Sequence, residues 1–250
     1  MDDRQSDITG QYALHMQKQL VQHCLAPWPR RSRTLLEVNC GRGELLPLLW
    51  EYGFDMTATE HNPELRAEAS RMADRAEVLA AADDHLPFDD DDFDWVVLHL
   101  VSSGAPSARA AMAEALRVAS AGVAITFWNA ASLPYMLHRL TGRKNPWPGP
   151  AFCWWQVWRA LRSLAAGSIS GASVLAGPQG TWNPLCWLAR CNKVLPWLPM
   201  GAWGIIRIDL NKSRPVTPLP LRIGRRRMRR PEPVMECGHK SQAKAVNTER

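Results

Sequence analysis

The chain has 250 residues, a mass of 28.0 kDa, 46% hydrophobic residues and a formal net charge of +6. Its mean hydropathy is -0.26 and it has no uncharged apolar run of about 18 residues or more, which argues against a membrane-spanning helix. This size and composition allow one domain with a substantial core and some additional segments.

The N-terminal stretch and the cysteines predict the cellular location of the protein. The N-terminal stretch is acidic and polar, so a signal peptide is not predicted and a cytoplasmic location is expected. The six cysteines are scattered without the spacing of a zinc site, which predicts free thiols and no metal centre. Residues 211–250 are rich in proline and arginine and are predicted to form a disordered basic tail. Such a tail can contact nucleic acid or an anionic membrane, but a solvated tail without a specific nucleic-acid partner is the simpler interpretation.

One helix is predicted before the first strand. Over residues 8–25, Tyr12, Met16 and Leu20 recur at every fourth position, which is typical of an amphipathic helix, and Pro27 with Pro29 ends it. Residues 1–33 are therefore expected to form an N-terminal helical cap. This cap either covers a ligand pocket or only packs against the core.

The stretch 34–49 organises the rest of the chain. It begins with the apolar run Leu35-Leu36, continues through a polar turn at 39–43 and ends in an apolar helical segment. Strand, glycine turn and helix form the opening unit of a nucleotide-binding α/β sheet, where glycines permit a sharp bend close to the ligand. A dinucleotide site is disfavoured because Leu46 occupies the third glycine position and Glu44 places a negative charge where a diphosphate would bind.

This stretch resembles motif I of the class I S-adenosylmethionine (SAM)-dependent methyltransferases, in particular the methyltransferase type 11 or ubiquinone-biosynthesis-methyltransferase-like group. Glu37, Gly41 and Gly43 match the pattern acid-x-G-x-G-x-G, and Asn39 replaces its first glycine. Because asparagine tolerates a positive φ, Asn39 is predicted to keep the turn. The resemblance implies that these four residues bind SAM, a ligand whose ammonium and sulfonium groups suit an acidic site.

A further acid is expected in the cofactor site. Glu60 ends a predicted strand at 56–59 and follows Glu37 by 23 positions. In nucleotide-binding α/β folds an acid at this point accepts hydrogen bonds from the ribose hydroxyls. The residues Asn62-Pro63 then predict the start of a helix over 63–73.

The stretch 86–96 also resembles the family, through Leu86-Pro87-Phe88 and Phe93-Asp94-x-Val96. The family usually has an acid directly after the third strand, predicted here at 77–81, and that acid accepts from the adenine amino group. Ala82 occupies the position in this chain. The resemblance therefore implies that Asp83, or else Asp84, takes the role.

Two candidate catalytic residues lie at or just after the ends of predicted strands. Strands are predicted at 95–100 and 123–128, with a helix at 106–119 between them, and active sites in open α/β sheets lie outside the carboxyl ends of the strands. His99 lies near the end of the first strand and is a candidate general base, although a hydrogen-bonded structural histidine explains it equally well. Asn129 follows the second strand and is a candidate orienting group.

The segment 131–166 departs from the minimal fold because it is rich in proline and tryptophan. We expect a helical insert after the fifth strand that shapes the acceptor pocket, with Trp154 or Trp155 against the acceptor. The alternative is that these tryptophans only pack the insert. Further strands are predicted at 168–176 and 204–210, the second antiparallel to the first, with a short helix at 185–194 between them.

Together these elements predict a Rossmann-like, doubly wound α/β domain over 34–210 with a seven-stranded, mostly parallel sheet. The resemblance implies SAM-dependent, in-line methyl transfer to a small-molecule or lipid-like acceptor. The alternative is a degenerate SAM-fold module that binds a partner or membrane surface, which the many tryptophans and the basic tail favour. Peripheral membrane contact is compatible with both, and the sequence carries no signal for an oligomeric state.

Overall fold

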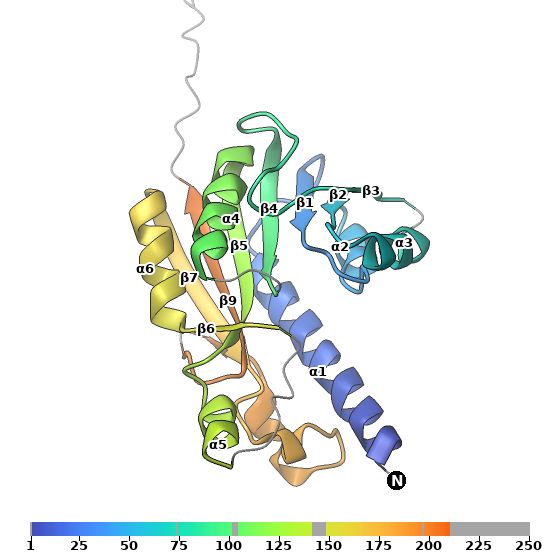
Figure 1. The fold of residues 1–250 in the computed structure, drawn as a ribbon, viewed down its shortest axis with the longest axis vertical. Coiled ribbons are helices and arrows are strands. Elements are labelled where there is room, and N and C mark those ends of the chain that lie inside the picture. The colour runs from blue at the N-terminus through green and yellow to red at the C-terminus, as the bar shows by residue number, and fades with distance from the viewer. Residues whose placement is uncertain (1, 74, 102–104, 142–148, 197, 211–250) are drawn as a thin grey trace, which may run out of the picture. The chain divides into compact units, whose positions relative to one another are not determined.

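The computed structural model describes residues 2–73, 75–101, 105–141, 149–196 and 198–210 (Figure 1). The chain divides into two compact units, Met1–Lys212 and Ser213–Arg250. The second unit and the basic tail predicted over 211–250 lie outside the described residues. All described helices and strands belong to the first unit.

One sheet of nine strands runs through the described part of the chain, in the order β3-β2-β1-β4-β5-β9-β7-β8, with β6 beside β5. The strands from β3 to β5 are parallel, and β9 lies antiparallel between β5 and β7. The two shortest strands are β6 (Ala151–Phe152) and β8 (Leu195–Pro196). The other seven are β1 (Thr34–Val38), β2 (Asp55–Thr59), β3 (Glu77–Leu79), β4 (Phe93–Leu100), β5 (Ala119–Asn129), β7 (Gly167–Val174) and β9 (Trp203–Leu210).

Helices cover both faces of this sheet (Figure 1). One face packs against α1 (Asp2–Leu25), α2 (Leu46–Glu51) and α3 (Pro63–Met72), and the other against α4 (Ala105–Val118) and α6 (Trp154–Leu164). Neighbouring strand residues alternate between the two cores, so Leu35 faces α1 to α3 and Leu36 faces α4 and α6. The predicted doubly wound, mostly parallel fold is confirmed, as is the antiparallel strand at 204–210. The described sheet has nine strands and not the predicted seven, because the two-residue strands β6 and β8 also pair with it. No helix in the described ranges is both long and apolar enough to cross a bilayer.

Local sequence explains where some elements begin. Asn62 caps α3, because its side chain accepts from the backbone N–H groups of Glu64 at 2.8 Å and Leu65 at 3.4 Å. The helical segment predicted at the end of the stretch 34–49 starts at Leu46, because residues 41–45 form a turn in which Gly43 has a φ of 77°. The helix predicted at 185–194 is a 3-10 segment, η2 (Trp187–Asn192).

The carboxyl ends of β1, β5 and β7 share one edge of the sheet, because β5 is parallel to β1 and β9 is antiparallel to both β5 and β7. At this edge, α5 (Leu133–Thr141) follows β5. The segment η2 meets the end of β7, where the Leu175 N–H donates to the carbonyl of Asn192 at 3.1 Å. The loop at 198–201 is also tied there, since the Gly201 N–H donates to Ser173 Oγ at 3.0 Å.

Trp154 lies in the core and does not fit the pocket role that its aromatic neighbourhood suggested. Its side chain is 2% exposed and packs beside Phe127, with ring centroids 5.7 Å apart. Two glycines make room for the ring: a Cβ would come within 2.6 Å of it at Gly171 and within 2.9 Å at Gly204. Trp155, one position on, is 54% exposed. Packing of the insert therefore accounts for Trp154.

Candidate functional site

The glycine turn after β1 has the left-handed backbone conformation that glycine adopts readily. Asn39, Gly41 and Gly43 all have positive φ values, of 57°, 59° and 77°. The prediction that Asn39 keeps a left-handed turn is confirmed. A side chain at Gly43 would also lie 2.9 Å from Leu46 and 3.0 Å from Cα of Ala69, whereas the space in front of Gly41 is open. The turn is therefore packed against α3 on one side and accessible at Gly41.

Asn39 does more than tolerate the turn. Its Nδ2 donates to Oδ2 of Asp83 at 3.0 Å and to the carbonyl of His99 at 3.2 Å. These bonds connect the end of β1 with the loop after β3 and with the end of β4. A glycine at position 39 could form neither bond. Asn39, at the first glycine position of the motif, thus holds Asp83, the acid that directly follows Ala82.

Glu60 closes the other side of the turn. Its two carboxylate oxygens accept from the backbone N–H groups of Gly41 and Asn62, each at 2.9 Å. The carboxylate is buried, with 7% of the residue exposed. Each oxygen keeps a further lone pair, because a carboxylate accepts at about four positions. Glu60 can therefore hold the turn and still accept from a ligand.

A buried row of polar side chains crosses three strands behind the turn. Nε2 of His99 on β4 lies 2.9 Å from Oε1 of Glu37 on β1, and Nδ1 of His99 lies 2.6 Å from Oγ1 of Thr126 on β5. Both ring nitrogens of His99 are thus engaged. The second oxygen of Glu37, Oε2, is buried and has no hydrogen-bond partner among the described residues. Thr126 escaped the sequence analysis, although it is a polar residue in an otherwise apolar strand.

The electrostatic character of the turn is negative. Burial raises the pKa of the Cys40 thiol, and the nearby carboxylates of Glu37 and Glu60 raise it further. Cys40 therefore remains a neutral thiol between two acids. A ligand with a cationic end is favoured at such a site, and a phosphate is disfavoured.

Asp84 and Asn129 are the remaining predicted site residues. Asp84 is exposed. Asn129 is buried and fully bonded: Nδ2 donates to the carbonyls of Pro199 at 2.7 Å and Gly201 at 3.1 Å, and Oδ1 accepts from the N–H of Ala131 at 3.0 Å. These contacts account for Asn129 as the anchor of the 198–201 loop.

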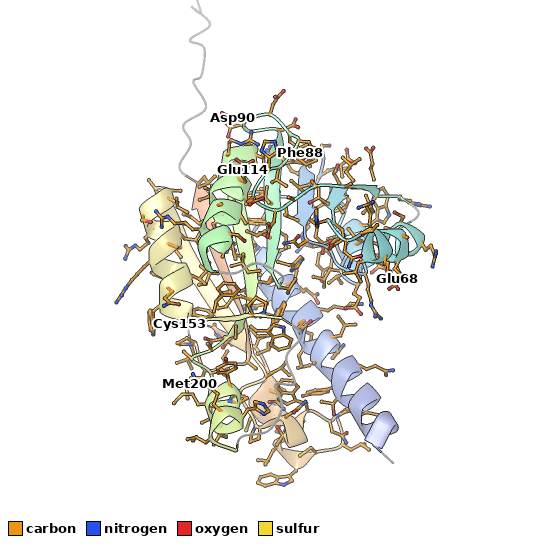
Figure 2. All side chains as sticks on the ribbon, in the orientation of Figure 1. Glu68, Phe88, Asp90, Glu114, Cys153 and Met200 are labelled. Atoms are coloured by element: carbon orange, nitrogen blue, oxygen red, sulfur yellow. The ribbon has the colours of Figure 1, made fainter. Side chains whose placement is uncertain are left out.

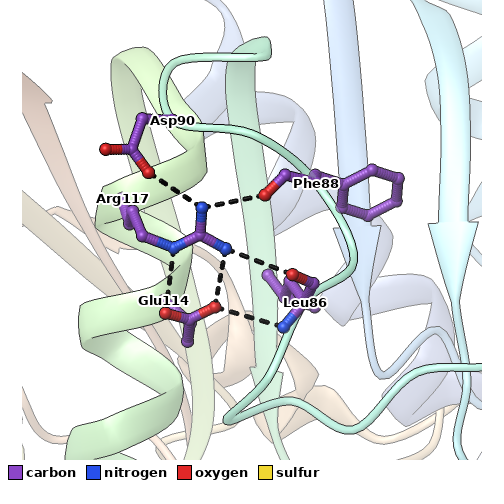
Figure 3. A network of polar contacts seen from close by, with 5 residues as sticks. All are labelled: Leu86, Phe88, Asp90, Glu114 and Arg117. Atoms are coloured by element: carbon purple, nitrogen blue, oxygen red, sulfur yellow. Dashed lines mark hydrogen bonds and ion pairs between the residues drawn. The ribbon is translucent and has the colours of Figure 1, made fainter.

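A clamp that the sequence analysis missed holds the loop between β3 and β4. Figure 3 shows Arg117 of α4 donating to the carbonyls of Leu86 and Phe88, at 3.1 and 2.8 Å, and to the carboxylate of Asp90 at 2.9 Å. Glu114 pairs with Arg117 at 2.8 Å and accepts from the Leu86 N–H at 3.1 Å. The hydrogen bond from Arg117 lowers the pKa of Glu114. The Leu-Pro-Phe stretch is therefore a structural element that fixes the loop carrying Asp83.

A groove of about 790 Å³ opens between α1 and the segment 184–194. The hydroxyl of Tyr12 on α1 spans it by donating to the carbonyl of Ala189 at 3.2 Å. Among the described side chains, its lining combines apolar groups with His15, Arg190 and Lys193 and has no carboxylate. The other lining residues are Ile8, Gln11, Met16, Gln19, Pro184 and Val194. Sequence reasoning could not find this groove because its two walls are far apart in the chain.

The cluster around the glycine turn fits SAM. The unpartnered Oε2 of Glu37 can accept from an ammonium group, Glu60 can accept from ribose hydroxyls, and the open face of Gly41 lets a ligand approach the backbone. Across the described residues, no group of three or more His, Cys, Asp or Glu side chains could hold a metal ion.

Comparison with known proteins agrees with this geometry. Residues 36–127 match the family model described as a methyltransferase domain, and this range contains the whole cluster. Comparison with curated protein sequences finds no match.

Solved methyltransferase structures share the fold. A SAM-dependent methyltransferase from Thermotoga maritima, described as a possible histamine N-methyltransferase, superposes with a TM-score of 0.64 at 17% identity, over 80% of this chain and 91% of that one. Magnesium protoporphyrin IX methyltransferase from Synechocystis PCC 6803, with bound SAH, gives a TM-score of 0.59 at 13% identity, over 79% of this chain and 84% of that one. The Synechocystis enzyme has also been solved with bound SAM.

Proposed function

We propose that this chain is a class I SAM-dependent methyltransferase that methylates a bulky, mostly apolar acceptor carrying an anionic group; the match of residues 36–127 to the methyltransferase-domain model supports the first part. The observation that carries this proposal is the groove between α1 and 184–194, with its apolar walls and its cationic side chains Arg190 and Lys193. A volume of about 790 Å³ lies within the range for drug-sized ligands, roughly 300–1,000 Å³. A small polar acceptor would leave most of this space unfilled.

The position of the groove supports the assignment. The segment 184–194 is tied to the carboxyl end of β7 through Leu175 and Asn192, and β7 ends at the same edge of the sheet as β1. Ligands of open α/β sheets bind outside this edge. An acceptor in the groove would therefore approach the cofactor from the side that α1 covers.

We further propose that Glu37, Asn39, Gly41, Gly43, Glu60 and Asp83 hold the cofactor, with the exposed Asp84 at the rim. SAM supplies an electrophilic methyl group on a sulfonium, and the acceptor atom forms its new bond to that carbon while the carbon–sulfur bond breaks and S-adenosylhomocysteine leaves. The protein's part is alignment of the two reactants. In this scheme Glu37 receives the cationic end of SAM and Glu60 the ribose.

No general base is needed if the acceptor reacts in an ionised form, as an anionic acceptor can. This agrees with His99 and Asn129, whose polar atoms are all engaged within the protein. We propose that His99 positions Glu37 and that Asn129 positions the 198–201 loop. Neither residue then exchanges a proton with the acceptor.

The test compares two probes of opposite charge. We expect calorimetry to detect binding of protoporphyrin IX, an apolar macrocycle with two carboxylates, and no binding of histamine, a small cation. The double variant Arg190→Gln/Lys193→Gln should weaken protoporphyrin binding about tenfold or more, because two charge-assisted contacts are lost. The matched control, Arg159→Gln/Arg162→Gln, removes the same charge from exposed positions of α6 and should bind as the wild type does.

A second measurement addresses methyl transfer itself. Release of S-adenosylhomocysteine should be faster with apolar carboxylates or phosphates than with small amines. Preference for histamine in both assays would overturn the assignment of the acceptor class. Tight SAM binding without turnover of any apolar anion would favour the alternative of a binding module.

A further inference from the structure

The half of the chain that follows β4 has an unusual charge distribution. From residue 115 to residue 208 the sequence contains no aspartate or glutamate but nine lysines and arginines. This acid-free stretch forms β5, α5, α6, β7 and η2, and so builds the edge of the sheet where α5 lies. Its basic residues are Arg117, Arg139, Arg143, Lys144, Arg159, Arg162, Arg190, Lys193 and Arg207, of which Arg143 and Lys144 lie outside the described residues.

The outward face of α5 carries an apolar stripe. Leu133, Met136, Leu137 and Leu140 occupy positions i, i+3, i+4 and i+7 of this helix, so they lie on one face. They are 44%, 55%, 39% and 82% exposed. A helix of a water-soluble domain normally turns such a stripe inward, so a face of this kind marks an interaction surface.

Further apolar side chains continue the stripe. Leu198 and Met200 are each 49% exposed, and the Leu133 N–H donates to the carbonyl of Met200 at 3.4 Å. Figure 2 shows Met200 beside α5. From the same edge of the sheet, Leu185 and Trp187 project with 91% and 82% of their surfaces exposed.

We propose that this edge is a docking surface for an anionic membrane, with the apolar face of α5, Leu198 and Met200 entering the interface. The positive charge of this edge indicates that the partner on this surface is anionic. Arg139 flanks the stripe in the last turn of α5, and Arg190 and Lys193 lie at the same edge. Amphipathic helices with basic flanks bind in this way, with the helix axis in the plane of the interface. Tryptophan, here Trp187, is enriched at the boundary between headgroups and acyl chains.

The docking surface and the acceptor groove share one edge of the sheet, so a lipid-like acceptor could pass from the bilayer to the groove. The docking itself does not rest on the proposed activity. It is measured without SAM or acceptor, so its failure and the failure of the proposed function are distinguishable.

The experiment is flotation of the full chain with vesicles of phosphatidylcholine alone and with vesicles of phosphatidylcholine and phosphatidylglycerol in equal parts. We expect binding to the mixed vesicles, little binding to phosphatidylcholine, and loss of binding at high salt. The variant Met136→Gln/Leu140→Gln keeps the charge and good helix formers, and it should weaken partitioning about tenfold or more, because two apolar side chains no longer enter the bilayer.

Met72→Gln is the matched control. Met72 lies on α3, is 54% exposed, nearly as much as Met136, and belongs to the acidic half of the chain. This variant should bind vesicles as the wild type does. Equal binding of all variants would mean that charge alone acts, through the basic tail or elsewhere, and would overturn the proposal. The proposal would also be overturned if the wild type does not bind anionic vesicles. A dimer in size-exclusion chromatography that depends on the stripe would overturn it as well.

Discussion

The Nε2 atom of His99 lies 2.9 Å from Oε1 of Glu37, and both side chains are buried at the junction of β1 and β4. His99→Ala would leave both oxygens of this carboxylate without a partner. We expect a loss of about 1–3 kcal/mol of folding free energy. Each kcal/mol should lower the Tm by about 2–4 °C for a domain of this size. Differential scanning calorimetry measures the change, and His99→Gln, which retains a donor, should recover part of it.

The same variant distinguishes positioning from proton transfer. If His99 positions Glu37, His99→Ala weakens SAM binding and leaves the shape of the pH–rate profile of kcat unchanged. If His99 is the general base, kcat loses one limb of that profile while SAM affinity is retained. The second result would support the role of general base that the sequence suggested for His99.

Glu60→Gln should weaken SAM binding by roughly 10- to 100-fold, since charge-assisted hydrogen bonds contribute about 1.5–3 kcal/mol each. The substitution keeps the size of the side chain but replaces one acceptor of the backbone N–H groups of Gly41 and Asn62 with a donor. Titration calorimetry with SAM provides the measurement. Glu51→Gln, at an exposed position at the end of α2, is the control and should bind SAM normally. Unchanged affinity of Glu60→Gln would refute its assignment to the ribose.

Substitutions at Asn39 should separate backbone strain from side-chain bonding. Asn39→Val places a β-branched residue at a φ of 57°, which costs about 1–3 kcal/mol, and also removes the bonds to Asp83 and His99. Asn39→Gly accepts the backbone conformation and loses only the bonds. We expect the glycine variant to fold well but to exchange amide hydrogens faster in the loop after β3. Equal protection in the wild type and Asn39→Gly would mean that the bond to Asp83 does not restrain this loop.

The clamp between Glu114 and Arg117 should make the free energy of unfolding depend on pH in the acidic range. The hydrogen bond from Arg117 lowers the pKa of Glu114 below its ordinary value of 4.5. The resulting stabilisation is present above the unfolded pKa and disappears as the pH falls through the folded pKa. Wild type should therefore melt above Glu114→Gln at neutral pH, and the two Tm values should converge in acid. Asp89→Asn, in the exposed part of the same loop, should follow the wild type throughout.

Local signals in the sequence were sufficient for the cofactor half of the fold. The glycine turn, the cap at Asn62 and the apolar strands each depend on residues close together in the chain, so their order and most boundaries could be predicted. The link from His99 to Glu37 and Thr126 could not, because it depends on the register of three strands. The choice between the pocket and packing roles of Trp154 stayed open for a related reason: its burial depends on Gly171 and Gly204, which lie on later strands.

The position of β9 has a consequence for synthesis of the protein. This strand is the last described one in the chain, yet it lies between β5 and β7 and pairs with both. Until the ribosome has synthesised β9, one edge of β5 and one edge of β7 have no strand to pair with. Unpaired strand edges invite association between chains, and long-range strand pairing is slow to form. A nascent or truncated chain that ends before Trp203 is therefore exposed to aggregation, and the described sheet becomes continuous only when β9 has left the ribosome.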